Sequence, residues 1–165
     1  MIFVTVGTHE QPFDRLLKCI DKMVENGKIK EDVVVQKGYT DFELKYCKEY
    51  RLIEYDEMQK YIQEARICIT HGGPASFLNV LSYGKVPIVF PRKKNFNEHV
   101  NNHQLDFAKQ VEKRMKNIIV AENEEELEDA IVNYDEKIKK INNAVNSNNK
   151  KFIEDLGEQL KKFYS

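Results

Sequence analysis

Short runs of β-branched and aromatic residues alternate with amphipathic segments over the first 120 residues. Ile2 to Val6, Asp32 to Gln36 and Ile67 to Thr70 are apolar over most of their length, as expected of strands buried on both faces of a sheet. In the segments between them, apolar residues recur every three or four positions, which is the period of a helix. This alternation predicts an α/β fold with a doubly wound parallel sheet of four or five strands.

Further elements complete this expected sheet. We expect a helix from near Pro12 and two short extended pieces within residues 43–55, the second at Arg51 to Tyr55. A helix capped by Asp56 should follow. Val86 to Phe90 and Ile118 to Val120 supply the remaining strands.

Composition excludes several classes of protein. The 165 residues are 41% hydrophobic and 32% charged, which fits one soluble globular domain. A net charge of −1 gives no general attraction to nucleic acid. The three cysteines lack disulfide or zinc spacing, so we expect reduced thiols, with Cys19 and Cys68 in the core. No apolar run is long enough to span a membrane, and no signal-peptide pattern is present. We therefore expect a cytoplasmic protein that reaches a membrane only through a partner.

The stretch after Ile69 carries the first candidate site. Gly72 and Gly73 allow a sharp turn and the close approach of a ligand, and Pro74 suits the first position of a helix. The N–H groups from Ala75 to Phe77 would then point out of a positively polarised helix end, and the Ser76 hydroxyl adds a donor. This arrangement predicts an anion site. The alternative, that these glycines form only a tight turn and His71 is a satisfied polar residue, stays open on these residues alone.

A second polar cluster follows the next strand. It comprises Pro91-Arg92, Glu98-His99 and Asn102-His103-Gln104. Because consecutive parallel strands place their following turns at one edge of the sheet, both clusters should face one crevice. The first turn, Gly7-Thr8, has too few glycines for a dinucleotide fingerprint, and no Gly-Lys-Ser/Thr phosphate loop occurs.

These motifs carry a family resemblance. His71-Gly72-Gly73, Gly84-x-x-Pro87 and the segment from Pro91 to Gln104 resemble the nucleotide-sugar-binding half of GT-B glycosyltransferases, specifically the family 28 C-terminal domain. The most similar types are stand-alone subunits, namely the bacterial PssE-type exopolysaccharide or capsule subunit and the small catalytic subunit of the eukaryotic UDP-N-acetylglucosamine transferase. The resemblance implies a Rossmann-like, nucleotide-sugar-binding domain at residues 1–121. Residues 122–165 would form a long C-terminal helical extension that packs on the domain, on a partner subunit, or on both.

The resemblance also implies a donor site for a UDP-sugar, in which Asn102 and Gln104 bind sugar hydroxyls and the loop at Tyr55 lies near the uracil ring. Arg92 is expected to add positive charge at the diphosphate. At three positions the chain departs from the family pattern. Asn79 replaces an acidic residue that binds ribose, Ala75 replaces a glycine, and Asn102 replaces the aspartate of an Asp-His-Gln motif. The expected donor-binding residues are Gly7, Thr8, Tyr55, His71, Gly72, Gly73, Pro74, Ala75, Ser76, Asn79, Arg92, Asn102, His103 and Gln104.

Candidates for acid–base work are His9, Glu98 and His99, unless a partner supplies the base. No Asp-x-Asp pair occurs, so we expect no metal and no cofactor. The implied function is the donor-binding subunit of a two-component, metal-independent inverting glycosyltransferase. Its partners would be a membrane-associated acceptor-binding subunit and a lipid-linked saccharide acceptor, with no role for nucleic acid. Two alternatives remain, a non-catalytic enhancer subunit, which Asn79 favours, and a nucleotide-sugar-binding regulator.

Overall fold

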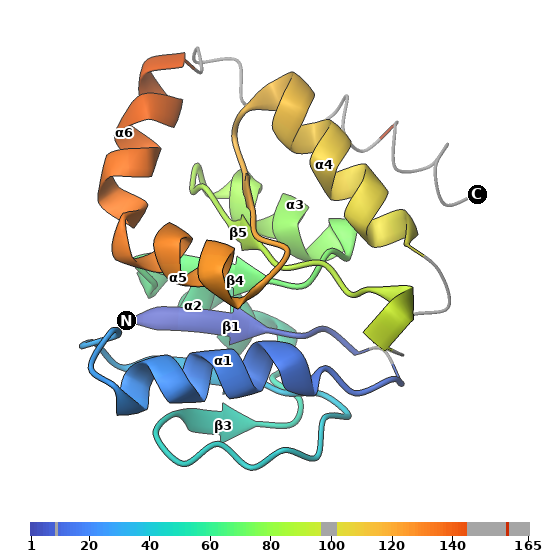
Figure 1. Ribbon diagram of the computed structural model, residues 1–165, viewed down its shortest axis with the longest axis vertical. Helices are drawn as coiled ribbons and strands as arrows, with labels where there is room; N and C mark the ends of the chain where they lie inside the picture. Colours follow the sequence, from blue (N-terminus) through green and yellow to red (C-terminus); the bar gives the residue numbers. More distant parts are fainter. Residues whose placement is uncertain (9, 97–101, 145–157, 159–165) are drawn as a thin grey trace.

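The computed structural model describes residues 1–8, 10–96, 102–144 and 158. Six parallel strands in this part of the chain form one sheet in the order β3-β2-β1-β4-β5-β6 (Figure 1). This confirms the predicted doubly wound parallel sheet, although the sheet has six strands where four or five were expected. The strands are β1 (Ile2–Thr5), β2 (Val33–Gln36), β3 (Lys48–Tyr50), β4 (Ile67–Thr70), β5 (Ile88–Val89) and β6 (Ile119–Val120).

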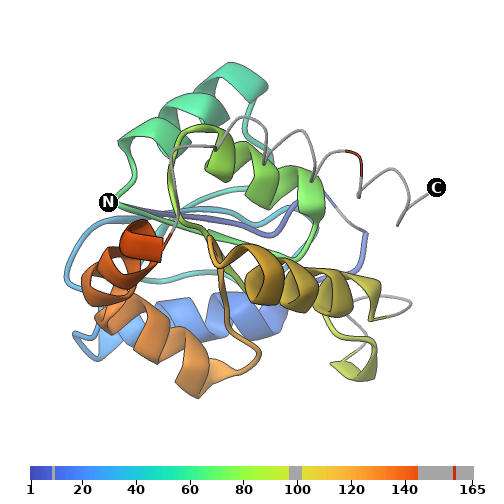
Figure 2. The ribbon, with the colours of Figure 1, turned by 90° about the horizontal axis from the view of Figure 1, so that it is seen from above.

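Helices cover both faces of the sheet. In Figure 2, α1 and α5 lie below the sheet, and α2 and α3 lie above it. The α-helices are α1 (Asp14–Glu25), α2 (Tyr55–Glu64), α3 (Pro74–Ser82), α4 (His103–Met115), α5 (Glu124–Val132) and α6 (Tyr134–Ala144), and a 3₁₀ turn, η1 (Lys94–Phe96), precedes α4.

The central strand shows why its residues are apolar throughout. Ile2 and Val4 pack into the core between the sheet and helices α1 and α5, whereas Phe3 faces α2 and stacks on Tyr61 with ring centroids 5.4 Å apart. Successive side chains of a strand point to opposite faces, so a strand covered on both sides buries every residue. The sheet thereby holds β1 beside β4, where the strand order reverses.

Two predicted boundaries are wrong. The third strand covers Lys48–Tyr50, not Arg51 to Tyr55. The backbone N–H groups of Lys37 and Gly38 donate to the carbonyls of Tyr50 and Arg51, and the chain leaves the sheet after these bonds. Helix α2 begins at Tyr55 with Glu54 as its N-cap, since the Met58 amide donates to the Glu54 carbonyl (2.9 Å). Asp56 therefore lies in the first turn, where the helix dipole still favours its charge.

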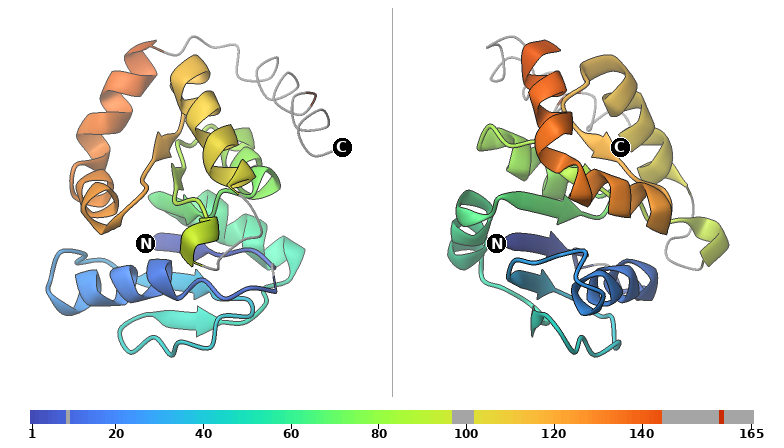
Figure 3. Two further views of the ribbon diagram at one scale, coloured as in Figure 1. Left: turned by 45° about the vertical axis from the view of Figure 1, so that its right-hand side comes forward. Right: turned by 60° about the vertical axis from the view of Figure 1, so that its left-hand side comes forward.

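The C-terminal extension begins as part of the same core. The Asn123 side chain accepts a bond from the Glu126 amide (2.8 Å), which confirms the predicted cap. Leu127 and Ile131 are buried in the cluster that contains β1, and the Tyr134 hydroxyl donates to the Val86 carbonyl (2.6 Å). Helix α6 rises from the end of α5 (Figure 3). The remaining residues, 145–157 and 159–165, lie outside the described part, so contact of the extension with a partner stays a prediction.

Lys85 should contribute measurably to stability. Its ammonium group donates to the carbonyls of Ile62 (2.6 Å), Gln63 (2.5 Å) and Ala65 (2.6 Å) at the C-terminal end of α2. Such a cation satisfies terminal carbonyls and complements the helix dipole. We expect Lys85→Met to lower the free energy of unfolding in urea by about 1–3 kcal/mol. Lys60→Met, at an exposed position of the same helix, should change it by less than about 0.5 kcal/mol. Equal effects of the two substitutions would contradict the capping role.

Candidate functional site

A cleft of about 450 Å³ opens at the carboxyl edge of the sheet, where the strand order reverses. In open α/β sheets this reversal leaves a crevice, because the connections on its two sides run to opposite faces. The turns after β1 and β4 meet here. Of the two polar clusters that the sequence predicts to face one crevice, the first contributes His71 and the residues from Gly73 to Ser76, and the second contributes Gln104. The lining residues are Thr5, Gly7, Thr8, Gln36, Met58, His71, Gly73, Pro74, Ala75, Ser76 and Gln104.

The imidazole of His71 organises the turn after β4. Its Nδ1 accepts a bond from the Gly73 amide (3.0 Å), and its Nε2 lies 3.0 Å from the Ser76 hydroxyl oxygen. Because Nδ1 accepts, we assign the proton of the neutral ring to Nε2, which then donates to Ser76. The Ser76 hydroxyl proton is left to point elsewhere, including into the cleft. His71 is thus satisfied within the turn, as the alternative interpretation proposed, and also lines the cleft.

Glycine is required on both sides of this ring. A Cβ atom on Gly7 would lie 2.4 Å from His71 Nε2, and one on Gly73 would lie 2.1 Å from His71 Cε1. Gly7 also has φ +75°, a left-handed conformation that side chains disfavour. The β1 and β4 turns are therefore in direct contact through the His71 ring.

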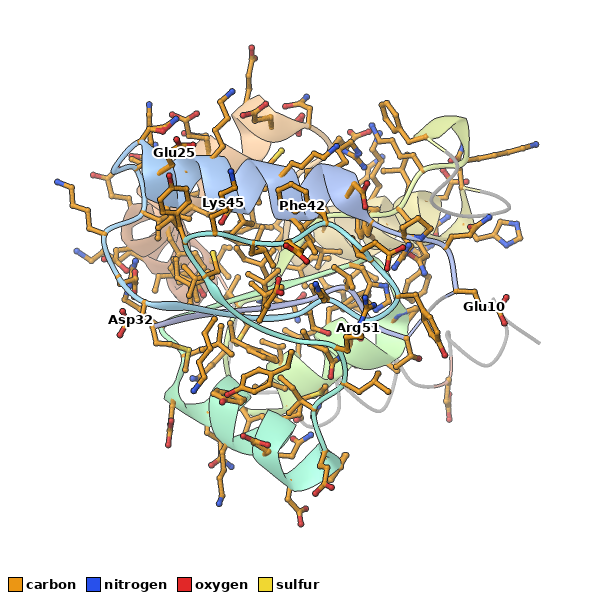
Figure 4. The ribbon with its side chains drawn as sticks, turned by 90° about the horizontal axis from the view of Figure 1, so that it is seen from below. Glu10, Glu25, Asp32, Phe42, Lys45 and Arg51 are labelled. Atoms are coloured by element: carbon orange, nitrogen blue, oxygen red, sulfur yellow. The ribbon has the colours of Figure 1, made fainter. Side chains whose placement is uncertain are left out.

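A third turn, after β2, supports the first. A Cβ on Gly38 would lie 2.5 Å from the Gly7 carbonyl oxygen. Arg51, the residue after β3, donates to the Gly38 carbonyl (3.2 Å) and fixes this turn. Figure 4 shows Arg51 and Glu10 toward the carboxyl edge, with Glu25 and Asp32 toward the opposite one.

The start of α3 offers fewer backbone donors than predicted. Pro74 occupies the first turn as expected, but the amides of Ser76 and Phe77 both bond the Gly73 carbonyl (3.0 and 3.4 Å). Of the three predicted donors, Ala75 alone has an amide without an acceptor in the described part of the chain. Ala75 is exposed and lines the cleft, so the helix end presents this amide and the Ser76 hydroxyl.

Gln104 enters the cleft from α4. Its side chain is 6% exposed, and an added Cβ on Gly72 would lie 2.8 Å from the Gln104 Cβ. Among the described residues, nothing bonds the buried Gln104 Oε1. A buried carbonyl oxygen without a donor is unfavourable by about 1–3 kcal/mol. A ligand hydroxyl or amide in the cleft would remove that cost.

The prediction that Arg92 touches an anionic ligand does not fit the structure. Arg92 is 1% exposed, and its guanidinium donates to the carbonyls of Gln11 (2.7 Å) and Val6 (2.9 Å). The pattern of apolar residues could not reveal that this side chain, three residues after β5, is buried. The neighbouring Lys93 pairs with Glu122, as does Lys109. Burial alone would raise the pKa of Glu122, but these two cations lower it.

Four further predicted donor-binding residues lie outside the lining of the cleft. Asn102 and His103 are exposed at the start of α4, and Asn102 Oδ1 accepts a bond from the Lys94 amide (3.0 Å). Tyr55 is 73% exposed at the start of α2, and Asn79 is half-buried in α3. None of these four is among the lining residues of the cleft as described. His9, Glu98 and His99 lie outside the described residues.

Sequence reasoning missed three lining residues, Thr5, Gln36 and Met58. Thr5 and Gln36 end neighbouring strands, and Gln36 Nε2 donates to Thr5 Oγ1 (3.0 Å), which also accepts a bond from the Gly7 amide (3.2 Å). Gln36 Oε1 accepts a bond from the Ile53 amide (2.8 Å). Thr5 and Gln36 could have been found from the sequence, because each is a polar residue at the carboxyl end of an apolar strand, where parallel sheets bind ligands.

Within residues 1–8, 10–96, 102–144 and 158, no group of three or more His, Cys, Asp or Glu side chains is placed to hold a metal. The helices described there include none with the length and apolarity needed to cross a bilayer.

Comparisons with known proteins agree with this architecture. The model of the glycosyltransferase family 28 C-terminal domain matches residues 1–160. The search of curated proteins gave no match. Among solved structures, the glycotransferase of kitacinnamycin superposes with a TM-score of 0.56 and 13% sequence identity. At that identity the likeness shows the fold alone. The alignment covers 98% of this chain and 39% of that one, so the chain spans well under half of that protein.

Contact between Gly7 and His71 gives a direct test of the site geometry. We expect Gly7→Ala to destabilise the protein, because the new methyl group overlaps the imidazole and the residue keeps a positive φ. Gly27→Ala is the matched control, since Gly27 has the same φ of +75° but nothing within 4 Å of an added Cβ. The free energy of unfolding in urea should fall by roughly 1–3 kcal/mol more for Gly7→Ala. A difference near zero would show that the ring moves aside freely.

Proposed function

This chain belongs to the glycosyltransferase family 28 C-terminal domain family, and on that premise we propose that its cleft binds a UDP-sugar as the donor of a two-component transferase. The observation that carries this proposal is the meeting of three features at the strand-order reversal. They are the Gly7-Thr8 turn, the His71 to Ser76 turn and Gln104 Oε1, which has no partner among the residues that the structure describes. The first adds Thr8 to the lining, the second supplies the Ala75 amide and the Ser76 hydroxyl as donors, and the third needs a donor from the ligand.

In this proposal the diphosphate lies at the start of α3. The positive end of the helix dipole, the Ala75 amide and the Ser76 hydroxyl would stabilise the charge that develops on the departing UDP. Because Ser76 accepts a bond from His71 Nε2, its proton is available for a phosphate oxygen. These groups provide leaving-group stabilisation without a metal, and the reaction would be inverting.

In this proposal, residues at the start of α4 bind the sugar. A hydroxyl of the donor sugar would donate to Gln104 Oε1, and Asn102, two residues earlier, is the N-cap of the same helix. Transfer also needs a base for the acceptor hydroxyl. We assign that role to His9, Glu98 or His99, or to a group from the partner.

An acceptor site also needs protein on the side of the cleft opposite the donor, which we call the second wall. The solved glycotransferase has more than half of its length without a counterpart in these residues. We propose that a separate, membrane-associated subunit supplies this wall and brings a lipid-linked saccharide, in the synthesis of an exopolysaccharide, capsule or glycolipid. The chain would then work in the cytoplasm at the inner face of the membrane.

A non-catalytic enhancer subunit is the second candidate. Asn79 favours it, because an amide holds ribose hydroxyls less strongly than a carboxylate does. Calorimetric titration with UDP separates the two, since an enhancer has no need to bind nucleotide.

The transferase proposal is tested by co-purifying this chain with the acceptor-binding subunit and supplying UDP-sugars and a lipid acceptor. We expect transfer with both chains and none with either alone. Transfer by this chain alone would refute the two-component arrangement. No transfer together with no UDP binding would refute the donor role.

We further expect Gln104→Ala to weaken binding of the UDP-sugar by about 1–3 kcal/mol, because a buried bond to the sugar is lost. Binding of UDP without the sugar should change much less. Gln110→Ala, at an exposed position of the same helix, is the control and should leave both affinities unchanged. Calorimetry with both ligands measures the difference, and equal losses for UDP and UDP-sugar would place Gln104 away from the sugar.

A further inference from the structure

Arg92 is the largest of the fully buried side chains in the described part of the chain. Its two terminal nitrogens bond two different carbonyls, with Nη1 donating to Gln11 and Nη2 to Val6. Val6 and Gln11 bracket the turn that contains Gly7 and Thr8. One side chain, three residues after the end of β5, therefore holds both ends of the turn that follows β1.

The chemistry of the guanidinium suits this role. Its rigid, planar fork presents several N–H donors in fixed directions, whereas an ammonium group on a flexible stem does not. The Arg92 group also lies 4.7 Å from the centre of the Phe13 ring, at the start of α1. The ring and the two carbonyls together fix the orientation of the fork.

The same segment contacts the second turn. Pro91 precedes Arg92, and a Cβ on Gly72 would lie 3.1 Å from the Pro91 Cβ. The segment that follows β5 thus packs against the turn after β4 through Pro91 and holds the turn after β1 through Arg92. Since Gly7 also packs on His71, the three segments form a closed set of contacts around the cleft.

We propose that Arg92 is a positioning residue for ligand binding, which acts through the Val6 and Gln11 carbonyls to hold Gly7 and Thr8 against His71. It does not touch the ligand. The identity of the ligand rests on the proposed function, but the effect of Arg92 on the turn does not.

The test compares Arg92→Met with Lys85→Met. Both substitutions remove a cation that donates to backbone carbonyls, but Lys85 caps the far end of α2, at the opposite edge of the sheet. Arg92→Lys is the second variant, in case the methionine variant does not fold. It keeps the charge and one donor group but not the fork. Amide hydrogen exchange of residues 6–11, calorimetric UDP affinity and thermal unfolding are measured for each.

We expect Arg92→Met to speed exchange in residues 6–11 by about tenfold or more and to weaken UDP binding by about tenfold to a hundredfold. Arg92→Lys should fall between wild type and Arg92→Met in both measurements. Lys85→Met should lower the unfolding temperature while leaving both unchanged.

Two results would overturn the proposal. One is an Arg92 variant that loses stability while exchange in residues 6–11 and UDP affinity match those of Lys85→Met. The other is full UDP affinity in Arg92→Lys with unchanged exchange, because the fork would then be unnecessary. If wild type does not bind UDP, the donor proposal fails, and exchange in residues 6–11 alone decides the role of Arg92.

Discussion

The site depends on the contact between the backbone of the β1 turn and the imidazole of His71. Strands β1 and β4 are neighbours in the sheet, so the turns that follow them must share the space above its carboxyl edge. The ring fills that space and leaves no room for a side chain at Gly7 or Gly73. Glycine at these positions is thus explained by packing within the protein, before any ligand is considered. The same packing fixes the Ser76 hydroxyl beside the cleft.

Hydrogen bonding separates the polar groups that build the cleft from those that remain available to a ligand. Thr5, Gln36 and Arg92 are nearly inaccessible, and their bonds to neighbouring turns hold the edge of the sheet together. Gln104 is almost as buried, yet its carbonyl oxygen has no partner among the described residues. Buried polar groups are normally paired, so an unpaired one beside a cleft points to the ligand. In a family 28 C-terminal domain, this ligand is expected to be a nucleotide-activated sugar.

The first helix of the C-terminal extension is part of the folded domain. Leu127, Ala130, Ile131 and Tyr134 complete the core on one face of the sheet, so α5 belongs to the same folded unit as β1 and α1. Under the proposed function, the acceptor-binding subunit would contact the carboxyl edge of the sheet. In such a two-component transferase, this chain would bind the donor and stabilise the leaving group, and the other chain would bind the acceptor.

The sequence by itself determined that the chain forms a parallel sheet and that the candidate binding turns follow the carboxyl ends of its strands, because local period and strand–helix alternation encode these features. It also located Pro74 at the start of α3 and the Asn123 cap, which depend only on neighbouring residues. It did not give the number of strands, which is six in the described part of the chain. Tertiary structure decided the rest. Arg92 points inward to carbonyls more than 80 residues away, Gln36 bonds Thr5 across strands, and the Gly73 carbonyl takes up two of the expected helix-end donors. The first two are contacts between segments distant in sequence and the third depends on the detailed geometry of a turn, and no periodicity in a chain specifies either.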